Sequence, residues 1–304
     1  MFDPVDISDL AARLQTNERY IEKDWHLVRA LGVIATIKLD GVTPVFSGGT
    51  SLSTAWQVIQ RFSEDIDFKV AVKAASGSAE RKLRSTYREA VIGGLSAAGL
   101  VLDSAPLVGN MSRFFRARFH YGATFPVAAG VRPILQIEMT FSGTHLPPKE
   151  RPVQSLLSRA SKAEPEVNGL LCVDPIETAA DKISALAWRA AARDRTSETD
   201  DPSIVRHLHD LAALAPRAEA SPTFVPLAHK LLQIDARRTG DQAADGFALL
   251  RAMLPTIVGD PLWRQEYEEF VGAVSFGPAT DRVAFGRAVT VCEALVAKVL
   301  ADRG

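Results

Sequence analysis

Apolar and polar residues alternate along three stretches in the first half of the chain, 65–70, 115–121 and 134–140. A period of two is typical of a strand that buries one face and exposes the other. Apolar residues recur every three or four positions over 21–37 and 78–99, which predicts amphipathic helices. The order of these segments, with helices before and between the strands, favours an α+β fold over a regular βαβ array.

The pattern changes after the turn-rich segment 145–149, and apolar positions beyond it recur mainly at helical spacing. The run Asp174–Glu177 is a strong helix start, with an aspartate cap, a first-turn proline and an acid at the third position. We therefore predict an N-terminal core over 1–145 and a mainly helical C-terminal domain over 146–304. Further helices are predicted at 203–214, 222–236, 242–254 and 279–301, and the polar stretch 194–202 is predicted to be a mobile connection.

The chain carries a formal net charge of −1 and two cysteines, and no apolar run in it is long enough to cross a bilayer. Its first ten residues hold three acids and no base, which a secretory signal would not. We therefore expect a cytoplasmic protein with no membrane contact and no disulfide framework. The near-zero charge also argues against a protein that coats nucleic acid by bulk electrostatics.

A local basic stretch qualifies that last conclusion. Between residues 111 and 133 the chain has no acid and four arginines, Arg113, Arg116, Arg118 and Arg132. Alternating arginines with aromatic residues behind them would present a positive face to a phosphate backbone, which is the only support from the residues themselves for an RNA substrate. The same pattern also fits a solvated edge strand that its charge protects from further pairing.

Candidate chemistry is concentrated between residues 47 and 67. The run Ser47–Thr50 (Ser-Gly-Gly-Thr) follows a short apolar segment and leads into a helix. Its glycines permit close approach of the backbone to a ligand, and the helix start offers N–H groups to a phosphate. Asp65 and Asp67 are two apart on the strand that follows, so both carboxylates project from one face. Adjacent carboxylates repel one another unless a cation lies between them, and Mg²⁺ prefers such oxygens together with substrate phosphates.

The joint arrangement predicts metal-assisted phosphoryl or nucleotidyl transfer. Each half alone is weak, because Gly-Gly also makes an ordinary turn and Asp-x-Asp can simply expose two solvated acids. The order of strand, Gly-Gly-Thr, helix and then two aspartates on a strand is more specific, because isolated strands rarely set two aspartates on one face.

Two motifs carry a family resemblance. GGTSLS at 48–53 and RFSEDIDF at 61–68 resemble the nucleotidyltransferase toxins of the AbiEii/AbiGii group, which supply the toxic half of bacterial toxin–antitoxin and abortive infection systems. DPIETAADKISALAWR at 174–189 and RHLHDLAAL at 206–214 are similar to later blocks of that family. The resemblance implies a polymerase β-like nucleotidyltransferase core, with a mixed sheet and flanking helices, joined to a C-terminal helical domain. It also implies an NTP and Mg²⁺ as ligands, a cognate antitoxin and, as in some members, the tRNA 3′ end as acceptor.

The functional residues of the family can be carried over to matching positions of this chain. Asp65 and Asp67 would bind the metal, and Glu138 is the best candidate for a third carboxylate, as ligand or base, although it could also be an acid on an exposed strand face. Thr54 departs from the family pattern, because many relatives carry a lysine there. The predicted nucleotide contacts are Ser47, Gly48, Gly49, Thr50, Ser63 and Lys182.

Two charged residues of the helical half complete the predicted site. Lys182 would reach the triphosphate, although its place on the flank of an apolar stripe also fits a solvated surface lysine. Asp210 lies in a block that lines the active site in the family, but it could instead pair with Arg206, four residues away on the same helix face. His207 and His209 point to different faces, which argues against a metal site with Asp210.

These observations predict a Mg²⁺-dependent nucleotidyltransferase toxin in which an acceptor hydroxyl, that of the tRNA 3′ end, attacks the α-phosphate of an NTP. Three alternatives fit the same residues: transfer to a small antibiotic acceptor, transfer to a protein hydroxyl, and a non-catalytic NTP-binding regulator. The presence of both aspartates argues against the regulator, whereas Thr54 keeps it open.

Overall fold

A mixed eight-stranded sheet lies within the described residues, in the order β3-β5-β6-β2-β1-β8-β7, with β4 also paired to β5. The computed structural model describes residues 2–126, 133–198, 200–277, 280 and 282–301. Two strand pairs, β2–β6 and β1–β8, are parallel, and the others are antiparallel. The strands are β1 (Val42–Ser47), β2 (Asp65–Val72), β3 (Val101–Leu102), β4 (Leu107–Gly109), β5 (Phe114–His120), β6 (Ile134–Thr140), β7 (Lys149–Val153) and β8 (Val167–Cys172).

Side-chain caps set the starts of the longer helices that accompany the sheet. The side chains of Asp3, Asn17 and Ser76 each accept a hydrogen bond from the backbone N–H of the second or third residue of the helix that follows. Each bond satisfies a donor that has no partner within its helix. The helices of this part are α1 (Pro4–Leu14), α2 (Glu18–Thr36), α3 (Gly48–Thr54), α4 (Gly77–Ala97) and α5 (Leu156–Ala160). The predicted helices at 21–37 and 78–99 correspond to α2 and α4.

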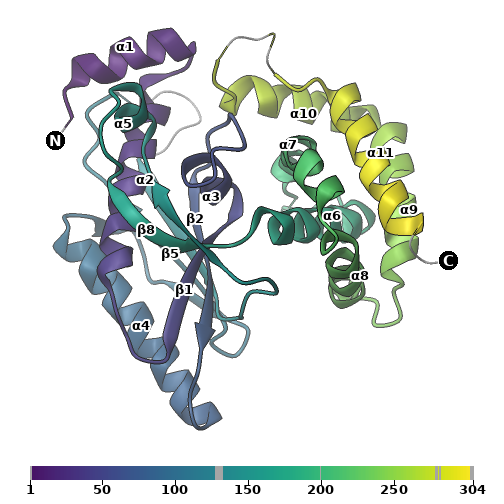
Figure 1. The fold of residues 1–304 in the computed structure, drawn as a ribbon, viewed down its shortest axis with the longest axis horizontal. Helices are drawn as coiled ribbons and strands as arrows, with labels where there is room; N and C mark the ends of the chain where they lie inside the picture. Colours follow the sequence, from purple (N-terminus) through teal and green to yellow (C-terminus); the bar gives the residue numbers. More distant parts are fainter. Residues whose placement is uncertain (1, 127–132, 199, 278–279, 281, 302–304) are drawn as a thin grey trace. The chain divides into compact units, whose positions relative to one another are not determined.

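One face of the sheet is apolar and is covered by α2 and α4 (Figure 1). Ile66 and Phe68 of β2 point to this face and are buried, whereas Asp65 and Asp67 point to the other face. The two helices pack closely, because a Cβ at Gly94 of α4 would lie 3.3 Å from side-chain carbons of α2 and its C-cap. The alternation predicted from the sequence therefore separates a packed face from a face that carries polar groups.

The contacts divide the chain into two compact units, with the division between Asp174 and Pro175 rather than at 145/146. β7 and β8 account for the difference, because β8 pairs in parallel with β1 and β7 pairs with β8. The segment 149–172 thus carries two strands with α5 (Leu156–Ala160) between them, and the helical unit begins after it. These strands are short, and the glycine in β8 weakens its pattern in the sequence.

The first unit also takes in two residues from much later in the chain. The backbone N–H of Phe276 donates to Gln60 O at 3.3 Å, and that of Gly277 donates to Leu14 O at 2.9 Å. The Phe276 ring packs on Phe62, with 5.1 Å between ring centroids. The sheet unit therefore includes a segment that the sequence places among the C-terminal helices.

The second unit is helical, which confirms the predicted C-terminal helical region. One helix was not predicted, α10 (Pro261–Val274), although the Asp260 side chain accepts from Leu262 N at 3.0 Å and a proline occupies its first turn. The other elements are α6 (Pro175–Ala192), η1 (Pro202–Val205), α7 (Arg206–Ala220), α8 (Phe224–Asp235), η2 (Ala236–Thr239), α9 (Gly246–Gly259) and α11 (Phe285–Ala301). None of the helices in the described ranges is both long enough and apolar enough to span a bilayer.

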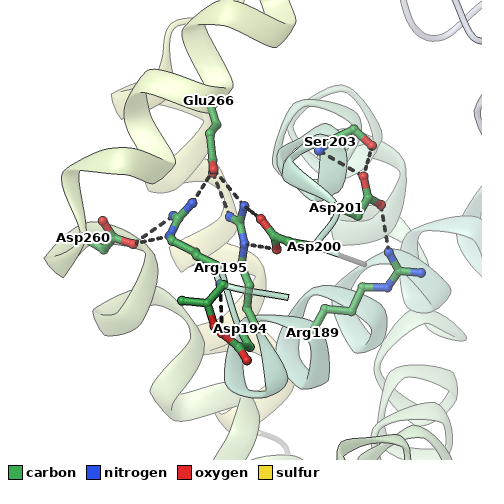
Figure 2. A network of polar contacts seen from close by, with 10 residues as sticks. Arg189, Asp194, Arg195, Asp200, Asp201, Ser203, Asp260 and Glu266 are labelled. Carbon is green, nitrogen blue, oxygen red and sulfur yellow. Dashed lines mark hydrogen bonds and ion pairs between the residues drawn. The ribbon is translucent and has the colours of Figure 1, made fainter. Parts of the chain in front are cut away.

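An arginine network lies at the connection that was predicted to be mobile (Figure 2). Arg193 donates to both carboxylate oxygens of Asp200 at 2.9 Å and to both oxygens of Glu266 at 2.7 and 2.8 Å. Arg195 pairs with Glu266 and, at 2.8 Å, with Asp260. Charge-assisted hydrogen bonds therefore join the described residues of this stretch to α10 and its N-cap.

Candidate active site

Three carboxylates lie together on the polar face of the sheet. The parallel pairing of β2 with β6 places Asp65 opposite Gln136 and Asp67 opposite Glu138. The antiparallel pairing of β1 with β2 places Ser47 opposite Asp67. The structure therefore brings the two predicted aspartates together with the predicted third acid, at the point where β1 ends in the Gly-Gly turn.

Glu138 is a member of a hydrogen-bonded network rather than a solvated acid on an exposed face. Its Oε1 accepts from Arg116 Nε at 2.7 Å and from Gln136 Nε2 at 2.9 Å. The same Gln136 nitrogen donates to Asp65 Oδ1 at 3.2 Å, and Gln136 Oε1 accepts from Arg118 Nε at 3.0 Å. One amide therefore links two of the three carboxylates.

The arginine-bearing strand β5 is not an edge strand. It pairs with β6 on one side and with β3 and β4 on the other, so the predicted solvated edge is wrong. Arg116 and Arg118 lie opposite Glu138 and Gln136 in register and contact them. Arg132, the last arginine of the predicted basic stretch, lies outside the described residues. The two central arginines therefore contact the residues of the acidic face.

The first glycine of the Gly-Gly turn makes room for a carboxylate. Gly48 has a φ of +76°, and a Cβ built there would lie 2.2 Å from Asp67 Oδ2. A residue with a side chain would be strained in this backbone conformation and would also displace the Asp67 carboxylate. The sequence predicted close approach of a ligand at this turn, and the structure shows close approach of a side chain.

The second glycine accommodates two residues of the later motif. A Cβ at Gly49 would lie 2.7 Å from Arg61 Nη2 and 2.9 Å from Ser63 Oγ. Arg61 is only 3 % exposed and donates to Phe62 O at 2.8 Å. Arg61 is not among the residues predicted for the site, although it opens the RFSEDIDF motif that also contains the predicted Ser63. A buried cation thus lies against the Gly-Gly turn.

Helix α3 is tied to the carboxylate strand through Thr50. The Thr50 hydroxyl donates to the backbone carbonyl of Asp65. Thr54, in the position where many relatives carry lysine, is buried, and its hydroxyl donates back to Thr50 O at 2.7 Å. Both hydroxyls are therefore used within the protein, and Thr54 supplies a helix contact where a lysine would supply a charge.

Glu64, between Ser63 and Asp65 in the motif, contacts a different part of the unit. It forms an ion pair with Lys23 of α2, whose ammonium is buried. Burial raises the pKa of Tyr20 on the same helix, and the charge of Glu64 adds to that rise. Glu64 therefore anchors the motif to α2 and stands apart from the acids on the polar face.

In the second unit, Lys182 and Asp210 form a buried ion pair between α6 and α7. Lys182 Nζ lies 2.7 Å from Asp210 Oδ2, with the two side chains 8 % and 0 % exposed. The alternative of a solvated surface lysine is therefore wrong. Arg206 contacts Asp201 and Ser203, so the alternative in which it would occupy Asp210 is wrong as well. The structure brings together the two charged residues that the sequence predicted in this half.

The two histidines near Asp210 do not make a metal centre. Burial, followed by the nearby Lys182 and arginine charges, holds the pKa of His207 well below its usual value. His209 Nδ1 lies 3.4 Å from Asp210 Oδ1. Across the described ranges, no three histidine, cysteine or acidic side chains are arranged to hold a metal ion.

Comparisons with known proteins show the family and the fold. Residues 36–291 match the family model described as "Nucleotidyl transferase AbiEii toxin, Type IV TA system". Among solved structures, the chain is similar to MenT4, a nucleotidyltransferase toxin from Mycobacterium tuberculosis H37Rv. The two share 17% sequence identity with a TM-score of 0.55, over 97% of this chain and 98% of that one. No match is found among curated proteins.

The fold and the matched family define a nucleotidyltransferase of the α+β class. The chain belongs to the AbiEii family of nucleotidyltransferase toxins, because the matching family model covers most of its length. This confirms the resemblance read from the GGTSLS and RFSEDIDF motifs. Membership in a toxin–antitoxin family also implies an NTP substrate and a cognate antitoxin.

Proposed function

We propose that Asp65, Asp67 and Glu138 form the site at which this toxin, with Mg²⁺, transfers a nucleotide from an NTP to the 3′ end of a tRNA. The observation that carries the proposal is the β2–β6 register, which sets Asp67 beside Glu138 and Asp65 one pleat away on the same face. Acids on neighbouring strands repel one another, and such a grouping persists when it serves a cation.

The donor set suits Mg²⁺. Carboxylate oxygens are hard ligands, and Mg²⁺ is usually held by one or two carboxylates that share it with water and substrate phosphates. A site of this kind does not need three protein ligands already in place. When bound, the ion would lower the pKa of the attacking hydroxyl and offset the charge of the leaving pyrophosphate.

The chain's own residues divide the remaining work. Asp65 and Asp67 hold the cation, and Gly48 leaves the space in which the Asp67 carboxylate lies. Both hydrogen bonds that the described residues give to Glu138 fall on Oε1. Its Oε2 would then contact the cation or take the proton of the acceptor hydroxyl.

The nucleotide is assigned to the Gly-Gly turn. The turn and the motif beside it would contact the triphosphate through backbone N–H groups and hydroxyls. The proposed contacts in this unit are Ser47, Gly48, Gly49, Thr50 and Ser63. Because the Thr50 hydroxyl already donates to Asp65 O, Thr50 would bind phosphate through its backbone N–H.

The tRNA acceptor is proposed on two grounds. Some members of the family transfer nucleotides to the tRNA 3′ end, and β5 carries arginines beside the acids. Arg116 and Arg118 are partly occupied by Glu138 and Gln136, so the basic strand gives less support than its sequence suggested.

The test is incubation with total tRNA, Mg²⁺ and each α-labelled NTP in turn. The matched pair of variants is Asp67→Asn, which removes a charge from the polar face, and Glu89→Gln, which removes one from the exposed side of α4. We expect a labelled tRNA band with one NTP, lost in Asp67→Asn and kept in Glu89→Gln.

Other outcomes would change the proposal in specific ways. A labelled polypeptide without labelled tRNA would move the acceptor to a protein hydroxyl. Label on a small hydroxylated compound alone would favour the antibiotic-type acceptor. Undiminished labelling in Asp67→Asn would overturn the assignment of the site itself.

A further inference from the structure

Gln136 makes three side-chain hydrogen bonds that together fix the orientation of its amide. Nε2 donates to Asp65 Oδ1 at 3.2 Å and to Glu138 Oε1 at 2.9 Å, while Oε1 accepts from Arg118 Nε at 3.0 Å. The reversed amide would place an oxygen against two carboxylates and an NH₂ group against the Arg118 N–H, so both sides would lose their hydrogen bonds. The network therefore allows only one orientation.

We propose that Gln136 is a positioning residue of the transfer site, which holds Asp65 and Glu138 in place for the metal, and that Arg118 acts through it. This inference rests on the proposed function. Neither residue belongs to the motifs that identify the family, and both are placed by the β5–β6–β2 register.

The physical need is the mutual repulsion of the acids. An NH₂ group has two protons, and here it offers one to each carboxylate, which lowers the cost of holding two negative charges near one another. Because the amide is neutral, it leaves the net negative charge of the pair intact for a cation. A lysine at the same position would occupy the site with its own charge.

Arg118 strengthens this arrangement. A charged donor on Gln136 Oε1 polarises the amide, so its N–H groups become better donors to Asp65 and Glu138. Arg116 contacts Glu138 directly and therefore does not act through the amide. The structure thus separates an arginine that acts on the acid from an arginine that acts through Gln136.

The experiment measures Mn²⁺ binding to the full chain without nucleotide, by electron paramagnetic resonance of the free ion. Gln136→Met keeps the side-chain length and removes all three hydrogen bonds, and Gln265→Met makes the same change on the exposed face of α10. Outer-shell partners of metal ligands typically contribute tenfold or more to affinity. We expect Gln136→Met to weaken Mn²⁺ binding by roughly tenfold and Gln265→Met to leave it unchanged.

A second readout separates positioning from chemistry. In tRNA labelling, Gln136→Met should need correspondingly more Mg²⁺ for half-maximal rate and should recover most of the wild-type rate at saturating Mg²⁺. Arg118→Met should weaken Mn²⁺ binding less, and the double variant should match Gln136→Met alone, because Arg118 acts only through the amide. Arg118→Met also provides the test if Gln136→Met does not fold.

Two results would overturn the inference. Wild-type Mn²⁺ affinity in folded Gln136→Met would remove the positioning role, and additive effects in the double variant would remove the coupling to Arg118. Failure of the proposed function is distinct from these, because the wild-type chain would then neither bind Mn²⁺ at this site nor label any acceptor.

Discussion

The polar face of the sheet and the arginine network of the helical unit hold acids in different ways. In the network, Asp200, Asp260 and Glu266 each face an arginine, and Glu266 faces two (Figure 2). On the sheet, Asp67 lies opposite Glu138, one neutral amide bridges Glu138 to Asp65, and Arg116 pairs with Glu138. The network pairs each of its acids with an arginine, whereas the sheet gathers three acids on two neighbouring strands and joins two of them through an amide.

The two arrangements contribute differently to the free energy of unfolding. Hydrogen bonds from Arg193 lower the pKa of Asp200, so the folded state favours its charged form. Trp263 lies beneath Arg193, 4.7 Å from ring centroid to guanidinium carbon, and completes a packed cluster. Asp200 thus contributes to stability through its paired arginine, whereas a group of three acids on one sheet face is typical of a functional site and motivates the proposed function.

The largest expected effect follows from removing a charge from the sheet face. Asp65→Asn should lower nucleotide transfer at least about a thousandfold, because the proposed site loses one of its two aspartate ligands. Its melting temperature should be at or above that of the wild type, since repulsion among the acids is relieved. Labelling assays and thermal melts, with Glu89→Gln as control, check both. Transfer near the wild-type rate would contradict the role proposed for Asp65.

Gly48→Ala tests the geometry of the same face without changing its charge. The new Cβ would collide with the Asp67 carboxylate and occupy a strained φ of +76°, so we expect roughly a hundredfold loss of transfer and about 1–2 kcal/mol of destabilisation. Gly93→Ala in α4 is the matched control, because a Cβ there meets no atom within 4 Å. Equal behaviour of the two variants would contradict the assigned role of Gly48.

In the arginine network, the same kind of deletion should affect stability instead. Glu266→Ala leaves Arg193, whose side chain is 6 % exposed, without one of its two acids, and we expect a loss of about 3 kcal/mol in the free energy of unfolding. Glu269→Ala, on the exposed side of the same helix, should cost little. Urea titration measures both, and transfer per folded molecule should stay at the wild-type rate. A loss of transfer with unchanged stability would contradict the structural role assigned to the arginine network.

The smallest expected effect concerns Asp24 on α2, which belongs neither to the arginine network nor to the acids of the sheet face. Burial raises its pKa from 3.8 to about 6, against the lowering effects of its hydrogen bond from Leu156 and of Arg159. Its contribution to stability is therefore present below pH 4 and is lost as the pH rises through about 6.

Asp24→Asn should remove the loss of stability that the ionisation of Asp24 causes as the pH rises. The variant should gain about 1–2 kcal/mol over the wild type between pH 4 and pH 7 in the free energy of unfolding. Its amide oxygen can still accept from Leu156 N, so the fold should be kept. Denaturant titrations at several pH values measure the difference, and parallel curves for the two proteins would refute the pKa assignment.

The sequence predicts the chemistry of the site better than the surroundings of its residues. The alternation in β2 predicts that Asp65 and Asp67 share one face, whereas the register that sets Glu138 opposite Asp67 comes from the parallel pairing of β2 with β6 and cannot be read from either strand alone. Arg61 and Gln136 could not be found in this way, because one acts from a buried position against Gly49 and the other acts across strands. Such contacts depend on tertiary packing, which periodicity does not report.

The missed elements have a similar cause. β8 is a six-residue strand with a glycine, and its place beside β1 depends on a partner more than 100 positions earlier. α10 could have been predicted, because Asp260 and Pro261 repeat the Asp-Pro helix start recognised at Asp174. The position of β8 depends on a partner that is distant in the chain, whereas the start of α10 is visible in the sequence and was overlooked.

The place of β8 and Phe276 in the sheet unit also bears on synthesis. All three acids have left the ribosome once residue 138 has emerged, but the sheet that aligns them gains β8 only at Cys172. The contacts of Phe276 with Gln60 and Phe62 form later still, once residue 276 has emerged. A nascent chain therefore carries its three acids long before the strand and the late segment that complete the sheet unit are available to it.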